Sequence, residues 1–356
     1  MPLDAGPNER QSVCTVLQNL GVEAEESTLG DRIVLVVQGD ACPVPKDAIG
    51  RIPGVERVVS LDTKTPLVDG TKISGSRAIT VGNARFGGGS ISVVAGPCTI
   101  EDSQILMATA EGVRASGAAA LRGGAFKSRT SPHSFQGGGL EAVQTMMATA
   151  KEVGLPFFTE LTDPRQVSMV GDMVDGVQVG ARHMQNVPLL IEVARLGKPI
   201  LLKRHMAADA EEWLLAAEYI LKEGNDQVIL CERGVKTSDH HVRYMLDLAV
   251  VPWLQERTGL PVIVDPSHAA GNHSLVPALA RAAVAVGADG LLVEVHPCPE
   301  TTRCDAAQAL NFEDFATLVE EVECIAELSG RHLVRPELTE EPEKREARTL
   351  KPALGH

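Results

Sequence analysis

The chain has 356 residues, 44% of them hydrophobic and 22% charged, which is enough for one sizeable domain with a large core and a smaller domain beside it. Its formal net charge of −14 argues against a nucleic-acid-binding surface, and it has no apolar run approaching the roughly 18 residues of a membrane span. Seven cysteines without a disulfide-like spacing indicate reduced thiols, and we expect a cytoplasmic protein.

Residues 1–66 are predicted to form a small ferredoxin-like α+β domain. The pattern indicates a helix at 11–21, strands at 22–28 and 32–39, a second helix at 44–52 and a third strand at 55–61. The order α-β-β-α-β is that of a βαββαβ unit that lacks its first strand. A regulatory role is the working hypothesis for this domain.

Residues 91–333 alternate short apolar strands with amphipathic helices eight times, which predicts a (β/α)8 TIM barrel. Near-continuous Val, Ile and Leu in the strands indicates burial on both faces, as in a parallel sheet. The pairs are 91–99 with 103–117, 118–126 with 140–154, 156–161 with 163–173, 176–181 with 186–197, 199–205 with 209–224, 227–233 with 240–259, 261–267 with 274–288, and 290–296 with 311–330. A doubly wound open sheet is the alternative, and the polar residues at the strand ends favour the barrel.

Two further segments flank the barrel. Residues 67–90, rich in Gly, Thr and Lys, are predicted to be a linker with a short hairpin, in which 78–82 is a strand and 84–89 a turn. Residues 334–356 are charged, contain proline and show no apolar periodicity, so we expect a disordered tail.

Basic residues follow the carboxyl ends of several predicted strands, where barrels of this type build their active sites. They are Arg122, Lys127, Arg129, Arg182, Lys203 and Arg233. Gathered at one mouth, these cations would repel each other unless anions lie between them, and Arg and Lys match the geometry and charge of phosphate. The sequence therefore predicts a locally basic pocket for more than one phosphate group. The alternative is that each cation pairs with a helix carboxylate.

A second set of strand-end residues suits a metal ion. Its members are Cys98, His268, Glu294 and Asp305. A thiolate, an imidazole and two carboxylates fit a divalent transition ion such as Mn²⁺, Fe²⁺, Co²⁺ or Zn²⁺, and not Ca²⁺. The alternative for Cys98 alone is a packing role. Further candidate ligands flank the site, namely His296, Cys298 and Cys304.

The strand-end motifs resemble those of the type Iβ family of 3-deoxy-D-arabino-heptulosonate 7-phosphate (DAHP) synthases over roughly residues 70–330. The motifs are AGPC (95–98), RGGAFKSRTSP (122–132), GARHMQN (180–186), LLKRHM (201–206), CERGVKT (231–237), VDPSHAAGNH (264–273) and VEVHPCPE (293–300). The resemblance implies a metal-dependent, aldol-type condensation of phosphoenolpyruvate with D-erythrose 4-phosphate and water, giving DAHP and phosphate. This is the first step of the shikimate pathway of aromatic amino acid biosynthesis.

The same resemblance implies roles for individual residues. The residues expected to hold phosphoenolpyruvate are Arg122, Lys127, Arg182, Lys203 and Arg233. Those expected to hold erythrose 4-phosphate are Arg129, Thr130 and Ser131, with Asp265 near its hydroxyls. Those that match the family's metal ligands are Cys98, His268, Glu294 and Asp305. Glu160 is expected to position the water that attacks C2, and Lys127 or Glu160 to manage its proton.

Some positions depart from the family pattern. Ser128 stands where Pro is typical, His183 replaces a common Asn and His205 a common Gly. Two alternatives therefore stay open: a divergent phosphoenolpyruvate-condensing paralogue that uses another aldose phosphate, such as a 3-deoxy-octulosonate 8-phosphate synthase, and a non-catalytic regulatory barrel. A homo-oligomer (tetramer or dimer) and an aromatic amino acid effector are further expectations.

Overall fold

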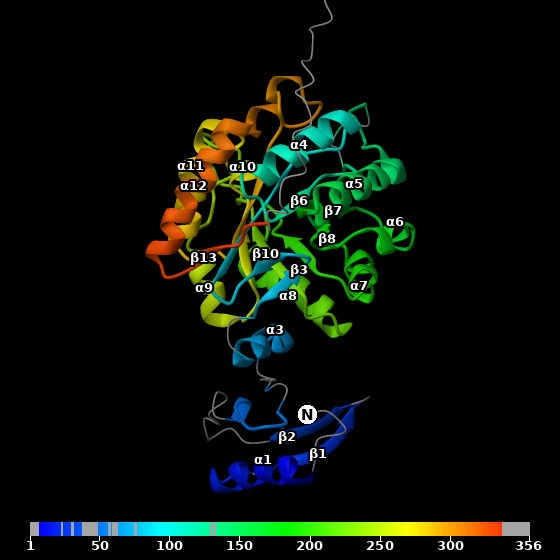
Figure 1. The fold of residues 1–356 in the computed structure, drawn as a ribbon. Helices are drawn as coiled ribbons and strands as arrows, with labels where there is room; N and C mark the ends of the chain where they lie inside the picture. The colour runs from blue at the N-terminus through cyan, green and yellow to red at the C-terminus, as the bar shows by residue number, and fades with distance from the viewer. Residues whose placement is uncertain are drawn as a thin grey trace, which may run out of the picture.

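The main body of the chain is a closed barrel of parallel strands surrounded by helices (Figure 1). The computed structural model describes residues 7–22, 24–29, 32–37, 49–55, 58, 63–74, 77–128, 131 and 133–336. The barrel strands are β5 (Ser90–Gly96), β6 (Ala120–Arg122), β7 (Phe157–Leu161), β8 (Gly176–Val179), β9 (Ile200–Lys203), β10 (Val228–Glu232), β11 (Val262–Val264) and β12 (Gly290–Glu294). Each pairs with the next along the chain, and β12 pairs with β5. The predicted (β/α)8 barrel is confirmed and the open sheet is excluded.

Helices between the strands cover the outside of the sheet. They are α4 (Ser103–Ala115), α5 (Gly139–Val153), α6 (Pro164–Val170), α7 (Val187–Arg195), α8 (Ala210–Lys222), α9 (Val250–Arg257), α11 (Val276–Ala285) and α12 (Phe312–Leu328). Asp163 and Asp209 begin α6 and α8 with capping boxes, in which the side chain accepts a backbone N–H of the first turn. The inner helix faces and the strands share one large apolar core. Short turns complete the layer: α10 (Pro266–Ala270), η2 (Gly171–Met173), η3 (Ala181–His183), η4 (His273–Leu275), η5 (Pro299–Thr301) and η6 (Ala306–Gln308).

The predicted helix 240–259 is wrong for its first half. Only Val250–Arg257 is helical, as α9, because the residues before it form a loop. Two backbone hydrogen bonds of 2.9 Å between Val235 and Met245 fold this loop back on itself. The side chain of Asp247 then accepts the first backbone N–H of α9 at 3.2 Å, which fixes where the helix begins.

A hairpin closes the end of the barrel at which the strands begin. β3 (Ile79–Val81) and β4 (Ala84–Phe86) pair in antiparallel, so the hairpin is confirmed, but the turn lies at 82–83 and the predicted turn at 84–89 is wrong for its first half. Phe86 meets Phe158 edge to face, with ring centroids 6.2 Å apart. Apolar side chains of the hairpin form one cluster with inward-facing strand residues. The opposite end of the barrel is therefore the one available for a cavity.

The linker contains a helix that we did not predict. α3 (Pro66–Gly70) packs against α8 and is followed by the turn η1 (Thr71–Ser74). The two carboxylate oxygens of Glu218, in α8, accept the backbone N–H groups of Leu67 and Val68 at 2.8 and 2.9 Å. First-turn N–H groups have no partner inside their own helix, so this carboxylate satisfies them and fixes the linker to the barrel.

The amino-terminal unit has a small core of its own and lies apart from the barrel, beyond α3 (Figure 1). Its elements are α1 (Pro7–Asn19), β1 (Ala24–Leu29) and β2 (Arg32–Val37). The two strands form an antiparallel hairpin, as predicted. Val13, Leu17 and Ile49 form the buried cluster of this core.

Several predictions fall on residues outside the described ones. They include most of the predicted helix 44–52, most of the strand 55–61, and the tail after residue 336. Arg335 is described and donates two hydrogen bonds to Glu323, at 3.0 and 2.6 Å, so the described fold extends beyond residue 333. The division into a regulatory domain and a catalytic domain stays a prediction. Within the described residues, no helix is long and apolar enough to cross a membrane.

We predict that Glu218→Ala lowers the free energy of unfolding by about 1–3 kcal/mol, because it removes two hydrogen bonds to a charged group and leaves two helix N–H groups without a partner. Urea denaturation followed by circular dichroism measures this change. The control is Glu256→Ala, at an exposed position of α9, where we expect a change within about 0.5 kcal/mol. Equal stability of the two variants would contradict the role of Glu218.

Candidate active site

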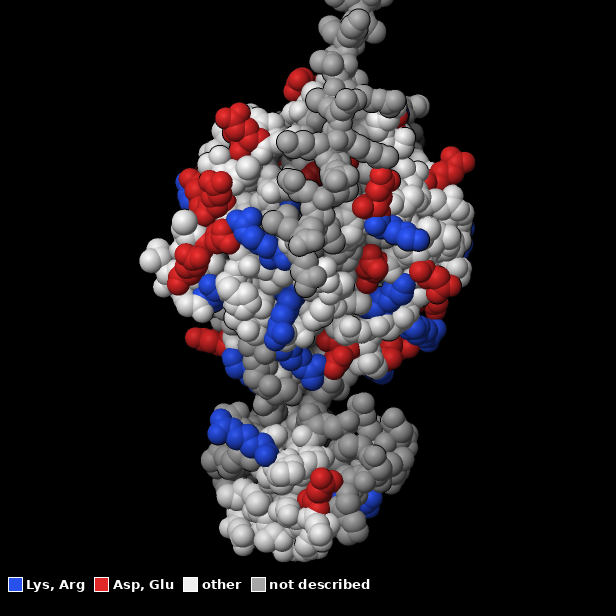
Figure 2. Space-filling view, viewed as in Figure 1, with Lys and Arg blue, Asp and Glu red and all other residues white. Residues whose placement is uncertain are grey.

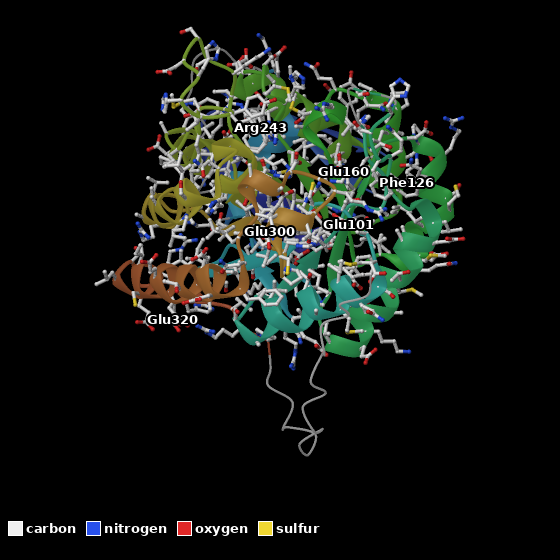
Figure 3. The ribbon with its side chains drawn as sticks, turned by 90° about the horizontal axis from the view of Figure 1, so that it is seen from above. Glu101, Phe126, Glu160, Arg243, Glu300 and Glu320 are labelled. Atoms are coloured by element: carbon white, nitrogen blue, oxygen red, sulfur yellow. The ribbon has the colours of Figure 1, made fainter. Side chains whose placement is uncertain are left out.

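A cavity of about 310 Å³ opens among the segments that follow the barrel strands. Predicted site residues that line it are Lys127, Ser131, Glu160, Arg182, Lys203, Arg233, His268 and Asp305. Lining residues that were not predicted as site residues include Ser128, Gln178, Met206, Arg243 and Tyr244. Figure 3 labels two of the lining residues, Glu160 and Arg243. These eight predicted site residues thus share one cavity, whereas Arg122 and Asp265 do not line it.

The four predicted metal ligands come together beside this cavity. One ligand atom from each of Cys98, His268, Glu294 and Asp305 lies within 4.8 Å of all the others. Cys98 and Glu294 are buried, whereas His268 and Asp305 also line the cavity. The cluster therefore lies where the cavity meets the barrel core, open on one side.

Backbone geometry at two positions makes this convergence possible. Gly96, with φ of +148°, ends β5 two residues before Cys98, and a Cβ there would lie 2.2 Å from the carbonyl oxygen of Arg122. Asp305 has φ of +57°, the only positive value for a non-glycine residue among those described. A side chain in this left-handed conformation costs energy, which the surrounding contacts must offset. Both positions hold the chain in the path that brings Cys98 and Asp305 together, with Sγ and Oδ2 3.3 Å apart.

Asp265 orients His268. It begins α10, and its Oδ1 accepts the backbone N–H of His268 at 2.9 Å. Its Oδ2 accepts a hydrogen bond from Lys203 Nζ at 2.6 Å and lies 2.8 Å from Nδ1 of the imidazole, so Nε2 faces Glu294, 3.3 Å away. We predicted that Asp265 contacts substrate hydroxyls, but it is fully buried beneath the cavity. Its position fits the orientation of a metal-binding histidine instead.

Glu294 is held from both sides. Arg122 Nη1 donates to its Oε1 at 2.7 Å, and Gln308 Nε2 donates to its Oε2 at 2.7 Å. Arg122 is 2% exposed and lies below the cavity, so the predicted direct contact with substrate is not what this position favours. Burial would raise the pKa of Glu294, but the nearby His268 and Arg122 lower it to about 2. The carboxylate is therefore ionised at neutral pH, as a metal ligand must be.

The protonation of the other groups also fits a bound cation. Burial lowers the pKa of His268 more than Asp265 and Glu294 raise it, so the imidazole is neutral and can bind through Nε2. The hydrogen bond to Cys304, with the two Sγ atoms 3.1 Å apart, and burial raise the pKa of the Cys98 thiol. A metal ion that binds there must displace this proton. The donor set thus fits a divalent transition ion.

The predicted cations are only partly paired. Arg122 and Lys203 bond to carboxylates of the site itself, not to helix carboxylates as in the alternative that we considered. Arg182 donates to the carbonyl oxygen of Ser128 at 2.7 Å. Arg233 stacks on the ring of Tyr244 at 4.5 Å, and within the described residues its Nε and Nη1 have no hydrogen-bond partner. Buried guanidinium groups without partners indicate a place for an anion.

Lys127 lines the cavity and contacts the predicted metal cluster. Its Nζ lies 3.3 Å from Cys98 Sγ. Burial disfavours its charge, yet Cys98 and Glu160 raise the pKa of Lys127 above the usual range for lysine. Lys127 therefore remains an ammonium group at the boundary between the metal cluster and the cavity.

The loop that follows β6 is tied to η3. Ser128 Oγ and His183 Nε2 are 2.6 Å apart, so two positions that depart from the family pattern contact each other. Arg129 and Thr130, the predicted contacts to the second substrate, lie outside the described residues. Ser131 is described and lines the cavity.

Sequence reasoning missed Arg243, Tyr244 and Gln308. The first two lie in the loop that we predicted to be helical, and Gln308 carries no charge to mark it. A strand-end analysis considers only the residues directly after each strand. The signal that could have found Arg243 is a basic residue beside an aromatic one within the long segment that follows β10.

The outer surface differs from the cavity. On the face shown in Figure 2, Asp and Glu side chains are interspersed with Lys and Arg, with neither sign gathered into one stripe. The net charge of −14 therefore describes the chain as a whole, whereas positive side chains concentrate in the cavity.

Comparisons with known proteins agree with this architecture. The model of the DAHP synthetase I family matches residues 70–328. The chain is 38% identical to the phospho-2-dehydro-3-deoxyheptonate aldolase of Thermotoga maritima over 320 residues, 90% of this chain and 95% of that one. The crystal structure of the Thermotoga maritima DAHP synthase aligns with a TM-score of 0.75 at 37% identity, over 93% of this chain and 97% of that one.

A second group of relatives is more distant. A 2-dehydro-3-deoxyphosphooctonate aldolase of Nitratidesulfovibrio vulgaris is 32% identical over 251 residues, 65% of this chain and 91% of that one. The match to the family model covers well over half of the chain and includes every residue of the metal cluster and the cavity. The chain belongs to the DAHP synthetase I family.

Proposed function

We propose that the chain catalyses the metal-dependent condensation of phosphoenolpyruvate with D-erythrose 4-phosphate and water, which gives DAHP and inorganic phosphate as the first step of the shikimate pathway. The observation that carries this proposal is the junction of a four-ligand metal cluster with a cavity lined by cations. Family membership makes the chain an enzyme of aldol-type phosphoenolpyruvate condensation. The finer assignment concerns the second substrate, the metal and the pathway.

We prefer the heptulosonate assignment over the octulosonate alternative because the heptulosonate relative matches a larger share of this chain. The Thermotoga maritima aldolase matches 90% of this chain at 38% identity. The octulosonate relative matches 65% at 32% identity. The segment from Lys127 to Ser131 also reads KSRTS, which is one residue shorter between Lys and Arg than the octulosonate pattern KANRSS. A regulatory barrel without activity is disfavoured because the ligand cluster is complete.

Cations of the cavity would bind phosphoenolpyruvate. Arg233 offers two guanidinium nitrogens that have no partner among the described residues, and Arg182 and Lys203 line the same cavity. Guanidinium groups bind phosphate and carboxylate through paired hydrogen bonds, which fixes the orientation of the molecule as well as its position. C3 of the enol is then directed toward the aldehyde carbon, an advantage of proximity.

Cys98, His268, Glu294 and Asp305 would hold the divalent ion, which when bound supplies Lewis acidity at the aldehyde carbonyl. The carbon–carbon bond forms between C3 of phosphoenolpyruvate and the aldehyde carbon. Water adds its oxygen to C2, its proton is taken up in the site, and phosphate leaves from C2. Glu160 lines the cavity and is suited to orient this water. The ammonium of Lys127 is suited to supply a proton to the former aldehyde oxygen, which becomes a hydroxyl.

Location, assembly and regulation complete the proposal. The free cysteines of the described residues support a reducing compartment such as the cytoplasm. The separate core of the amino-terminal unit supports a distinct domain, and its regulatory role with an aromatic amino acid effector rests on the family resemblance. A homo-oligomer, dimer or tetramer, rests on the family resemblance.

The function is tested by phosphate release from phosphoenolpyruvate with a panel of aldose phosphates of four and five carbons. We expect turnover with erythrose 4-phosphate, its loss on addition of EDTA, and its return with excess Mn²⁺ or Zn²⁺. Activity with arabinose 5-phosphate alone would support the octulosonate alternative. No activity with any aldose phosphate in metal-replete enzyme would contradict the proposal.

The metal site is tested by Cys98→Ser. A hydroxyl is a far weaker ligand than a thiolate for transition ions, so we expect loss of stoichiometric metal content and of activity. Metal content is measured by mass spectrometry after dialysis. Cys231→Ser, at a buried thiol of β10 outside the cluster, serves as the control and should retain the ion. Normal metal content in Cys98→Ser would remove Cys98 from the site.

The role of Arg233 is tested by Arg233→Met. Loss of charge-assisted hydrogen bonds worth about 1.5–3 kcal/mol should raise KM for phosphoenolpyruvate by roughly 10- to 100-fold. Initial rates at saturating aldose phosphate measure this effect. The matched control is Arg281→Met, whose guanidinium pairs with Glu321 on the outer helices. An unchanged KM for phosphoenolpyruvate would place the anion elsewhere.

A further inference from the structure

We propose that Gln308 and Arg243 are positioning residues, a hydrogen-bonded relay that runs from the cavity wall to the metal cluster and holds two of its carboxylates in place. The inference rests on the proposed metal site and adds residues that touch no ion themselves. Arg243 Nη1 donates to Gln308 Oε1 at 2.9 Å, and Gln308 Nε2 donates to Glu294 Oε2 at 2.7 Å. The relay therefore ends on one of the four ligands.

The chemistry of the three groups fixes the direction of the relay. A guanidinium only donates hydrogen bonds and a carboxylate only accepts them, so the amide oxygen must face Arg243 and the amide nitrogen must face Glu294. Gln308 is 2% exposed, and water cannot easily replace either partner. Glutamine is an uncharged side chain that can accept at one end and donate at the other, as this position requires.

Backbone hydrogen bonds keep Gln308 beside Glu294. The N–H of Leu310 donates to the carbonyl of Glu294 at 2.9 Å, and the N–H of His296 donates to the carbonyl of Leu310 at 3.0 Å. The segment that follows η6 thus runs alongside the end of β12 in parallel. Asp305 lies directly before η6, and its carbonyl accepts the N–H of Gln308 at 3.2 Å. One short stretch of chain therefore carries a ligand and the support of another ligand.

Arg243 is held at the cavity wall by its loop. Gly234, with φ of +91°, lies where a Cβ would come within 2.6 Å of Tyr244 Cβ, and Gly271 lies where a Cβ would come within 2.6 Å of Arg243 Cβ. The loop can approach the barrel this closely because both positions lack a side chain. Arg243 Nη1 is also 3.8 Å from Asp305 Oδ1, so its charge faces a second ligand.

These contacts restrain the carboxylates. Glu294 accepts a hydrogen bond from Arg122 on one carboxylate oxygen and from Gln308 on the other. The carboxylate plane therefore cannot rotate without the loss of a hydrogen bond. Removal of partners that orient metal ligands typically weakens metal binding by about 10- to 100-fold. We expect this range for the relay, since it acts on Glu294 directly and on Asp305 through charge.

The test measures the affinity of the full-length protein for Zn²⁺ alone, by competition with a chromophoric chelator. Gln308→Met and Arg243→Met should each weaken Zn²⁺ binding by about 10- to 100-fold, because Met preserves volume and removes the hydrogen bonds. If the two act as one relay, the double variant should bind no more than a few-fold more weakly than the weaker single variant. The control is Gln255→Met, whose amide bonds to the carbonyl of Gly287 away from the cluster and which should bind Zn²⁺ like the unaltered protein.

Unchanged Zn²⁺ affinity in both single variants, or losses that multiply in the double variant, would overturn the relay. Thermal unfolding of each variant is measured beside its Zn²⁺ titration to show that the variant is folded. Should Gln308→Met fail to fold, Arg243→Met still decides, since this side chain is 35% exposed and lies in a loop. The proposed function fails separately, when the unaltered protein binds Zn²⁺ but the metal-replete enzyme shows no activity with any aldose phosphate.

Discussion

Closure of the barrel between β12 and β5 is the constraint on which the site depends. In the register of this pair, Glu294 lies opposite Gly96. Cys98 follows Gly96 by two residues, so a thiol and a carboxylate that are nearly 200 positions apart in sequence share one edge. A shift of the register by one residue would turn Glu294 to the other face of the sheet and leave Arg122 as a buried charge without its partner.

Charge balance is the second constraint, and it follows from the first. Burial of an isolated carboxylate or ammonium costs several kcal/mol, so a buried charge is stabilised when it is paired. Arg122 with Glu294 and Lys203 with Asp265 are such pairs, each with an oxygen to nitrogen distance below 3 Å. Among the described residues, the predicted cations without a carboxylate partner are Lys127, Arg182 and Arg233, which line the cavity, where an anionic substrate would supply the missing charge. Burial alone does not separate the paired from the unpaired cations, since Lys203 and Arg233 are both buried and both line the cavity.

The sequence predicted most of the barrel because two independent signals agreed. Apolar runs gave the strands, helical periodicity gave the helices, and the polar residues fell at the same end of every strand. It also predicted that Cys98, His268, Glu294 and Asp305 lie together, since the first three each follow or end a strand. Their role as metal ligands stays a prediction. The loop before α9 was mistaken for helix because its spacing of apolar residues resembles a helical face, while its actual path is set by long-range contacts to Gly234 and Gly271. The sequence also could not predict burial. Arg122 and Arg182 both come at the end of a barrel strand or directly after it, yet Arg122 is buried and Arg182 is exposed.

One end of the barrel is closed by packing, and the other end carries the cavity. At the end where the strands begin, the hairpin β3–β4 packs Phe86 into the interior, and small changes there would create cavities or clashes. At the other end, loops carry the site, and substitutions can be absorbed when they compensate each other. Ser128 and His183 illustrate this: a position without the rigid backbone of proline gains a hydroxyl that bonds to the imidazole at 2.6 Å. This hydrogen bond restrains the loop after β6 at a position where proline would restrain it through its ring.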